Sequence, residues 1–320
     1  MAVGKRRAHP RITPRVPREV ARAAAALKAQ FSGVAGVFWG RGKTARRRHR
    51  KPHLCVHVYW KRDVTDAELI PNPFMGFPTD VIEVGRPQAH ALGSTCDLVG
   101  SGLVRHGTIA AVADDGAGSA IALMSGHVVL ATAHGSILTD YVGTPTGGTP
   151  LHAIDDDGAL FRGRVLRGRL ANHRDIDFAI ARFGGVAGMA LNPVHRLLGA
   201  PPFGTRSVAL IDGEPLHHDA IAQGRRGRMT GSFDQQAATE LELRLPDGTS
   251  GDYVDVIAVS SLAGEPPFSI EGDSGSLVFD DARTVVGMVL GSTAHHDIAY
   301  VLPIGPVVDT LDDVRSLFFL

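Results

Sequence analysis

Short apolar runs separated by glycine, proline and acidic turn residues fill the chain from about residue 93 to residue 305. The clearest pair is Leu277–Phe279 and Val285–Gly291, which an Asp280-Asp281 turn connects. Apolar runs of this length bounded by turn residues predict strands, and two of them joined by a short turn predict a hairpin. We therefore expect a mainly β fold over this part of the chain.

Both ends of the chain contain a predicted helix. Pro17–Gln30 combines an alanine-rich body with a proline whose fixed φ suits a first helical turn. Near the other end, apolar residues follow Pro306 at helical spacing, namely Val307, Val308, Leu311, Val314, Leu317 and Phe318. Residues 306–318 should therefore form a closing amphipathic helix.

The chain divides most naturally near residue 90. Strand-like runs at Val34–Trp39, Leu54–Lys61 and Asp80–Val84 follow the first predicted helix and make a small α+β unit with it. We expect residues 1–90 to form this unit and residues 91–320 to form the β domain. The unit lacks a convergent set of titratable groups, so we expect no catalytic role for it.

The composition is that of a globular chain with many turns. Of its 320 residues, 44% are hydrophobic and 21% are charged, and it contains 38 Gly and 19 Pro, which suits short strands joined by turns. Cys55 and Cys96 are its two cysteines, so a disulfide framework is not indicated. No apolar run approaches the roughly 18 residues of a membrane span, and none follows the charges at the start of the chain. These features predict a cytoplasmic protein that does not contact a membrane.

Positive charge gathers at the start of the chain, although the formal net charge is zero. Residues 1–51 contain fifteen Lys and Arg against the single acid Glu19, and residues 41–51 form the densest cluster. Such a cluster could bind nucleic acid or another acidic surface. Because apolar stretches flank it and no nucleic-acid motif lies beside it, we interpret it as a solvated hairpin loop.

A serine in a glycine-rich turn is the first sign of chemistry. In Gly272-Asp273-Ser274-Gly275 the two glycines allow a tight bend, which would expose the Ser274 hydroxyl. The same bend can aim the N–H groups of Gly272 and Ser274 at one point, as an oxyanion hole requires. By itself the motif is more typical of an ordinary turn. The predicted hairpin that follows it would, however, hold the serine rigidly.

A nucleophilic serine needs a base, and the base needs an orienting carboxylate. His127 follows the apolar run at residues 121–124, and Asp177 heads the apolar run at residues 178–181. Both therefore stand at strand ends, as the serine does. The favoured set is His127, Asp177 and Ser274, in that chain order.

Each of the two partners has a rival nearby. His134 lies in Ala131-Thr132-Ala133-His134, but it lacks a preceding aliphatic strand and a glycine turn follows it. Asp175 could replace Asp177, but starting the strand there would place a second carboxylate inside the run. We therefore favour His127 and Asp177.

Together these segments resemble the active-site segments of the trypsin/chymotrypsin-like serine peptidases, which have the same His, Asp, Ser order. Leu123–His127 resembles a T-A-A-H type turn, Asp177–Ile180 a D-I-A-L type strand, and Gly272–Ser276 the G-D-S-G-G segment. More weakly, residues 223–233 resemble the G-R-T-T-G stretch of bacterial members. The unit before residue 90 is similar to an extension that precedes the protease domain in certain bacterial members.

The resemblance implies two six-stranded antiparallel barrels and a C-terminal helix, with His127 and Asp177 on the first barrel and Ser274 on the second. It also implies a serine endopeptidase that cuts proteins or peptides without a cofactor. His127 would be the general base, Asp177 its orienting partner and Ser274 the nucleophile, while the N–H groups of Gly272 and Ser274 would bind the oxyanion. The same alignment places a specificity pocket, apolar or shallow, at Phe268, Leu290, Gly291, Ser292 and Ala299.

Two other classes of function stay open. The chain could be a catalytically inactive, protease-like binding module whose basic N-terminal unit engages a partner, because a triad in sequence need not assemble. Alternatively, His217-His218-Asp219 and His295-His296-Asp297 could belong to a metal site. Adjacent histidines on a strand point to opposite faces and cannot easily reach one ion, so we expect no metal.

Overall fold

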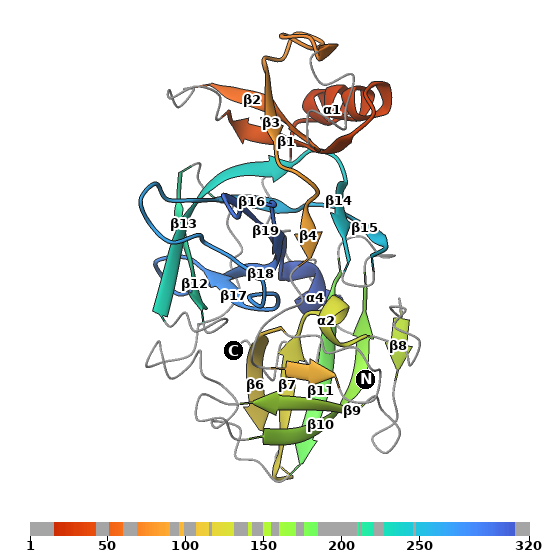
Figure 1. Cartoon of the computed structure of the whole chain (residues 1–320), viewed down its shortest axis with the longest axis vertical. Coiled ribbons are helices and arrows are strands. Elements are labelled where there is room, and N and C mark those ends of the chain that lie inside the picture. Colours follow the sequence, from red (N-terminus) through yellow and green to blue (C-terminus); the bar gives the residue numbers. More distant parts are fainter. Residues whose placement is uncertain are drawn as a thin grey trace, which may run out of the picture.

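The structure is a computed structural model, and its strands form two sheets. It describes residues 16–42, 51–59, 69–89, 96–98, 107–114, 117–130, 140–142, 150–154, 160–170, 176–184, 210, 213–220, 227–245 and 248–310. One sheet has twelve strands and the other has seven. Figure 1 shows an α+β unit at the top, the larger sheet in the middle and the smaller sheet at the bottom. The mainly β class predicted from the sequence is confirmed.

The α+β unit contains the predicted helix and the three predicted strands. They are α1 (Arg18–Gln30), β1 (Val34–Arg41), β2 (Pro52–Val58) and β3 (Thr79–Glu83). One face of α1 buries residues at spacings of three and four, namely Val20, Ala23, Ala24 and Leu27, which pack in one cluster with apolar residues of β1 and β2. Strands β1 and β2 are antiparallel, and their pairing extends to Arg41 and Pro52. The basic residues 43–50 connect these two strand ends and lie outside the described residues.

This unit is continuous with the larger sheet. Strand β1 pairs antiparallel with β13 (Gly227–Ala237). Buried His57 of β2 also reaches across, since its Nδ1 lies 3.0 Å from the Tyr300 hydroxyl and its Nε2 lies 2.8 Å from Gln235 Oε1. The predicted division near residue 90 therefore separates segments that share one sheet, and it stays a prediction.

Six strands of the larger sheet close into a barrel. Their order around the ring is β12 (Pro215–Ala220), β13, β16 (Ile257–Ser261), β19 (Ile298–Pro303), β18 (Val285–Ser292) and β17 (Leu277–Phe279), and β17 pairs with β12 again. All these pairings are antiparallel. Strands β17 and β18 form the hairpin predicted from the sequence. A second hairpin, β14 (Leu241–Arg244) with β15 (Ser250–Tyr253), and the two-residue strand β4 (Gln88–Ala89) lie beside the barrel.

The smaller sheet is antiparallel in all its described pairings. Its strands follow the order β5 (Cys96–Leu98), β9 (Pro150–Ile154), β10 (Leu160–Arg169), β11 (Phe178–Gly184), β7 (Ser119–Met124) and β6 (Ile109–Asp114), with β8 (Asp140–Val142) paired to β10. The short helix α2 (Gly126–Val129) follows β7 directly. The pairings of the described strands do not join β6 to β5, so a closed ring is seen only for the larger sheet.

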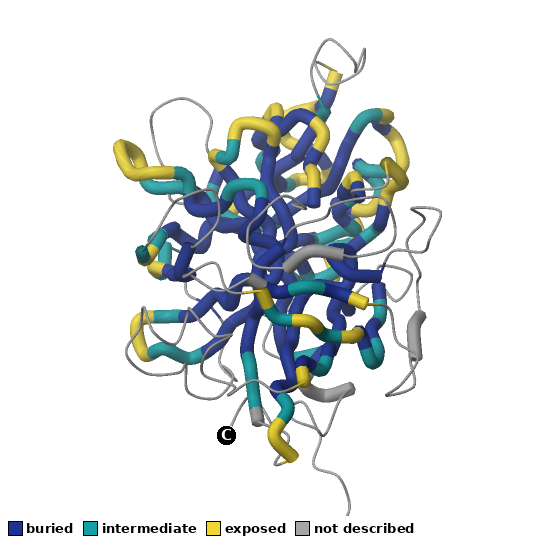
Figure 2. Tube along the Cα trace, turned by 60° about the horizontal axis from the view of Figure 1, so that its bottom comes forward, coloured by how far each residue is buried: buried dark blue, intermediate teal, exposed yellow. Residues whose placement is uncertain are grey.

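The described chain ends in α4 (Gly305–Thr310), which covers the first part of the predicted closing helix; residues 311–318 lie outside the described part. Buried residues run through the middle of the molecule, and exposed residues mark its outer turns (Figure 2). The largest buried cluster contains residues of both sheets, including Ala122 and Ala179 of the smaller sheet and Leu290 and Tyr300 of the barrel. No helix among the described residues is long and apolar enough to span a membrane.

Candidate active site

The smaller sheet brings His127 and Asp177 together. Strands β7 and β11 pair antiparallel, with Met124 opposite Ala179, so the end of one strand lies beside the start of the other. His127 Nδ1 lies 2.7 Å from Asp177 Oδ2, and the His127 backbone N–H donates to Asp177 Oδ1 at 3.0 Å. Gly126 makes this approach possible, because a Cβ there would lie 2.9 Å from Asp177 Oδ1 and 2.5 Å from the Arg169 carbonyl. The carboxylate therefore contacts the histidine through both oxygens.

The barrel supplies Ser274 from the connection between β16 and β17. Ser274 Oγ lies 2.8 Å from His127 Nε2, which completes a hydrogen-bonded chain from Asp177 through His127 to Ser274. Gly272 and Gly275 have φ values of 98° and 92°, the left-handed backbone that glycine adopts without strain. The structure thus brings together three residues separated by 50 and 147 positions along the chain.

Thr108, just before β6, holds the serine turn against the smaller sheet. Its N–H donates to the Ser274 carbonyl at 2.7 Å, and its hydroxyl donates to the Gly272 carbonyl at 2.8 Å. The approach is so close that a Cβ on Gly275 would lie 2.4 Å from the Thr108 carbonyl. No motif marks Thr108, so the sequence did not indicate this role.

The expectation of an exposed nucleophile is wrong for this structure, because Ser274 is 0% exposed. Its hydroxyl also donates to the Leu290 carbonyl of β18 at 2.9 Å. A hydroxyl has one proton, so the Leu290 carbonyl competes with His127 for it. Attack on a substrate requires the proton to point to His127.

Two backbone N–H groups of the serine turn have no hydrogen-bond acceptor among the described residues. The N–H groups of Asp273, Gly275 and Ser276 donate to the carbonyls of Ile270, Val289 and Asp273, respectively. In contrast, the N–H groups of Gly272 and Ser274 have no acceptor among the described residues. Unpaired amides beside a nucleophile are what an oxyanion hole needs.

Tyr253, the last residue of β15, is a further member of this site. Its hydroxyl donates to Asp177 Oδ2 at 2.9 Å, and the side chain is fully buried. Burial, with the negative charge of Asp177 and the hydrogen bond to it, raises the pKa of Tyr253 well above its ordinary value. The phenol therefore stays neutral and acts as a donor. Sequence reasoning missed it because its hairpin lies 76 positions from Asp177 and carries no motif.

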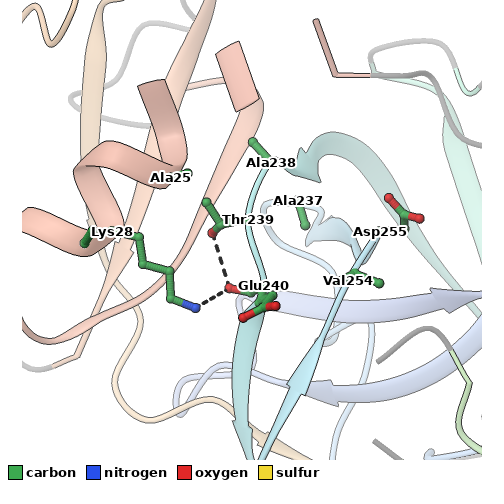
Figure 3. Close-up of a pocket in the computed structure, with 9 residues that line it drawn as sticks. Ala25, Lys28, Ala237, Ala238, Thr239, Glu240, Val254 and Asp255 are labelled. Atoms are coloured by element: carbon green, nitrogen blue, oxygen red, sulfur yellow. Dashed lines mark hydrogen bonds between the residues drawn. The ribbon is translucent and has the colours of Figure 1, made fainter. Parts of the chain in front are cut away.

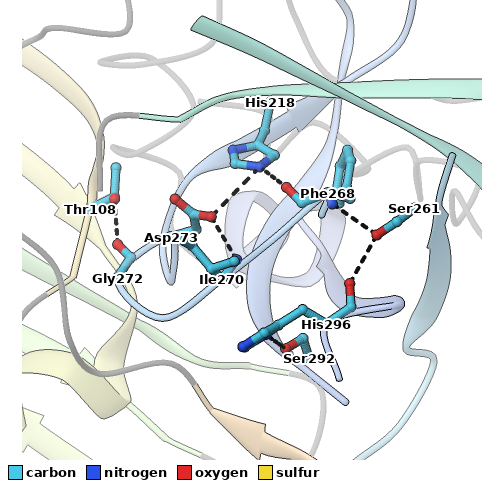
Figure 4. Close-up of polar contacts among 9 residues, drawn as sticks. All are labelled: Thr108, His218, Ser261, Phe268, Ile270, Gly272, Asp273, Ser292 and His296. Carbon is cyan, nitrogen blue, oxygen red and sulfur yellow. Dashed lines mark hydrogen bonds and ion pairs between the residues drawn. The ribbon is translucent and has the colours of Figure 1, made fainter. Parts of the chain in front are cut away.

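Asp273, next to Ser274, is buried in a polar network that Figure 4 shows. Its Oδ2 accepts from the Ile270 N–H at 2.9 Å and lies 3.9 Å from Nε2 of buried His218. The same His218 nitrogen donates to the Phe268 carbonyl. His218 therefore links β12 to the segment that leads into the serine turn.

The histidines considered as metal ligands contact different residues instead of facing one common point. His217 lies 2.9 Å from the Thr230 hydroxyl and 2.8 Å from Asp281 Oδ1, whereas His218 faces Phe268 and Asp273. In the second pair, His296 Nδ1 lies 2.7 Å from the Ser292 hydroxyl. Within the described parts of the chain, no group of three or more His, Cys, Asp or Glu is arranged to hold a metal ion.

The predicted pocket residues fall into two packing environments. Phe268 and Ala299 are buried in one apolar cluster, and the Phe268 ring packs edge-on against His218 at 4.8 Å. Leu290 packs in a different apolar cluster, which is the largest one. Gly291 and Ser292 end β18 beside β4. The specificity role of these five residues stays a prediction, and the rivals His134 and Asp175 lie outside the described residues.

A separate pocket of about 580 Å³ lies between α1 and the loops that flank β14 and β15 (Figure 3). Lys28 reaches across it to the Glu240 carbonyl at 2.7 Å, and Val254 and Asp255 lie on its far side. None of the predicted site residues lines it. It therefore has no part in the arrangement around Ser274.

Comparisons with known proteins find only distant similarity, and only to solved structures. No protein family matches the sequence, and neither does any curated protein. The active form of the Rv3671c protease from M. tuberculosis is 15% identical, with a TM-score of 0.39 and coverage of 97% of this chain and 93% of that chain. The MamO protease domain from Magnetospirillum magneticum is 14% identical, with a TM-score of 0.38 and coverage of 70% and 99%. An alpha-lytic protease homolog is 16% identical, with a TM-score of 0.36 and coverage of 70% and 98%.

These neighbours are too distant to say anything about activity, so the candidate active site rests on the positions of its own residues. Both halves of the fold contribute to it, the smaller sheet with His127 and Asp177 and the barrel with Ser274. The solved structures to which this chain shows this distant similarity are those of proteases.

Proposed function

We propose that the chain is a serine endopeptidase that cuts peptide bonds through an acyl-enzyme. The observation that carries the proposal is the hydrogen-bonded chain from Asp177 through His127 to Ser274, built from two halves of the fold. A buried histidine between a carboxylate and a serine hydroxyl is the arrangement that activates an otherwise weak nucleophile. No cofactor takes part in this chemistry.

Each residue has a defined step in the reaction. Ser274 Oγ attacks the peptide carbonyl while His127 Nε2 takes its proton, and Asp177 stabilises the imidazolium that forms. The N–H groups of Gly272 and Ser274 bind the oxyanion. His127 then gives its proton to the leaving amine, which departs as the C–N bond breaks. Water hydrolyses the resulting Ser274 ester by the same steps with His127 as base.

A fluorophosphonate probe tests the proposal directly, because it phosphonylates only an activated serine. We expect mass spectrometry to place the label on Ser274, and we expect His127→Ala to abolish labelling. An unlabelled chain that still unfolds cooperatively would instead favour an inactive, protease-like binding module.

The hydroxyl of Tyr253 should matter for turnover. A hydrogen bond to a charged group contributes about 1.5–3 kcal/mol, so we expect Tyr253→Phe to lower kcat at least about tenfold. Asp177 would lose one of its three donors and would hold the imidazole less firmly in place. The kcat of the variant and that of the unmodified chain, measured side by side, check this effect.

Tyr300→Phe is the matched control for this variant. Tyr300 is equally buried, but its hydroxyl contacts His57 and not the triad. We expect its kcat to match that of the unmodified chain. Equal losses of kcat in both variants would mean that Tyr253 acts through packing alone.

Substrate preference should follow from Phe268, because the sequence resemblance puts it where an acid would bind a cationic side chain. Without a buried carboxylate, a Lys or Arg side chain in the pocket would lose its hydration at a cost of several kcal/mol. We therefore expect a peptide library to be cut after apolar residues and poorly after Lys or Arg. Predominant cutting after Lys or Arg would mean that an acid such as Glu265 or Glu271 reaches the pocket.

A further inference from the structure

A segment of the chain itself lies on the edge of β18 next to Ser274. At its end, β18 pairs with β19 on one side, with Gly291 opposite Tyr300 and Ser292 opposite Ala299. On its other side β4 pairs antiparallel, with Gly291 opposite Ala89 and Ser292 opposite Gln88. The neighbouring residue, Leu290, is the one whose carbonyl accepts from the Ser274 hydroxyl.

Main-chain contacts hold this segment in place. The Val84 carbonyl accepts from the Ala294 N–H at 3.2 Å, and the Pro87 carbonyl accepts from the Arg244 N–H at 2.9 Å. Gln88 also pairs with Arg244 of β14, so β4 lies between β14 and β18. At Gly291 the backbones are so close that a Cβ would lie 2.0 Å from the Gln88 carbonyl. The edge of β18 is therefore filled by backbone.

The direction of β4 is that of a peptide approaching the nucleophile. Because the pairing is antiparallel, the step from Gln88 to Ala89 moves along β18 from Ser292 to Gly291, toward Leu290 and Ser274. A peptide that adds a strand to a sheet edge binds through main-chain hydrogen bonds. An extended substrate with its scissile carbonyl at Ser274 would need this same edge.

We propose that β4 is an intramolecular occupant of the substrate-binding edge of β18, so that the chain blocks its own active site. The proposal rests on the peptidase function proposed above. A peptide substrate must displace β4, whereas a small ester needs only the space at Ser274.

The block is competitive and reversible. Only two residue pairs join β4 to β18, but β4 belongs to the same chain, and a tethered segment has an effective concentration in the millimolar range. Weakening β4 should therefore speed the cleavage of extended peptides without changing the chemistry at Ser274.

Adjacent residues of β4 offer a matched pair of variants. Ala89 is buried against the core that contains Leu290, whereas Gln88 is exposed. Ala89→Asp would bury an unpaired carboxylate and expel the strand, whereas Gln88→Asp would place the same charge in solvent. We expect Ala89→Asp to raise kcat/KM for an eight-residue fluorogenic peptide at least tenfold, and Gln88→Asp to leave it unchanged. Hydrolysis of p-nitrophenyl acetate should be equal in both variants and in the unmodified chain.

Each outcome bears on a different claim. Peptide rates that stay equal while the ester rate is intact would overturn the block by β4. Absence of ester hydrolysis and of fluorophosphonate labelling in the unmodified chain would instead contradict the peptidase function. If Ala89→Asp loses its cooperative unfolding transition, Ala89→Gly decides the matter, because it removes only the buried methyl. A twofold to threefold rise in the peptide rate would then support the block, and an unchanged rate would overturn it.

Discussion

Ser274→Ala should lower turnover by up to about 10⁶-fold, the loss expected when a triad nucleophile is removed. The substitution deletes the atom that would form the acyl bond and leaves His127 without its hydroxyl partner. It also removes the hydrogen bond from Ser274 Oγ to the Leu290 carbonyl. Loss of one such bond costs about 1 kcal/mol, so the protein should stay folded. Peptide hydrolysis and thermal unfolding of the purified variant measure both effects.

Ser276→Ala is the control for this prediction. Ser276 lies in the same turn and is also buried, but its Oγ has no hydrogen-bond partner among the described residues. We expect its turnover to stay within about twofold of the unmodified chain. An unchanged rate in Ser274→Ala would end the serine mechanism, whatever Ser276→Ala does.

Asp177→Asn should lower turnover by roughly 10⁴-fold, because the histidine then adopts the wrong tautomer. In the structure Asp177 accepts from three donors, namely the His127 backbone N–H, His127 Nδ1–H and the Tyr253 hydroxyl. An amide cannot accept from all of them, since its NH₂ group only donates. His127 would therefore turn or change tautomer, and Nε2 would no longer take the Ser274 proton. The kcat of the variant, at unchanged pH, measures the loss.

Asp175→Asn provides the comparison, because Asp175 was the rival for the same role in the sequence. We expect its effect on kcat to be much smaller than that of Asp177→Asn. If Asp175→Asn has the larger effect, β11 begins two residues earlier in the chain than the structure shows.

Elements that depend on neighbouring residues could be predicted from the sequence. In helix α1 the buried residues recur at spacings of three and four over two turns, namely Val20, Ala23, Ala24 and Leu27. The β17–β18 hairpin shows its two apolar runs and the turn between them. The favoured His127, Asp177 and Ser274 each stand at a junction that such local patterns mark, and the structure places all three together.

Contacts that join distant segments could not be predicted in this way. The cross-connections of Thr108 to the serine turn, Tyr253 to Asp177 and His218 to Asp273 link residues without any motif. The pairing of β1 with β13 likewise joins the N-terminal unit to the barrel.

Local elements could be predicted and distant contacts could not, because the two depend on interactions of different range along the chain. Turn geometry, helical period and strand alternation act over a few residues, so Gly272–Gly275 and the strands around it can be read in order along the chain. The burial of Ser274 depends instead on how the two sheets pack against each other. The pairing at the end of β18 depends on which distant segment reaches that edge. That edge can accept any strand through its main chain, so only the tertiary structure decided that Gln88 and Ala89 lie there.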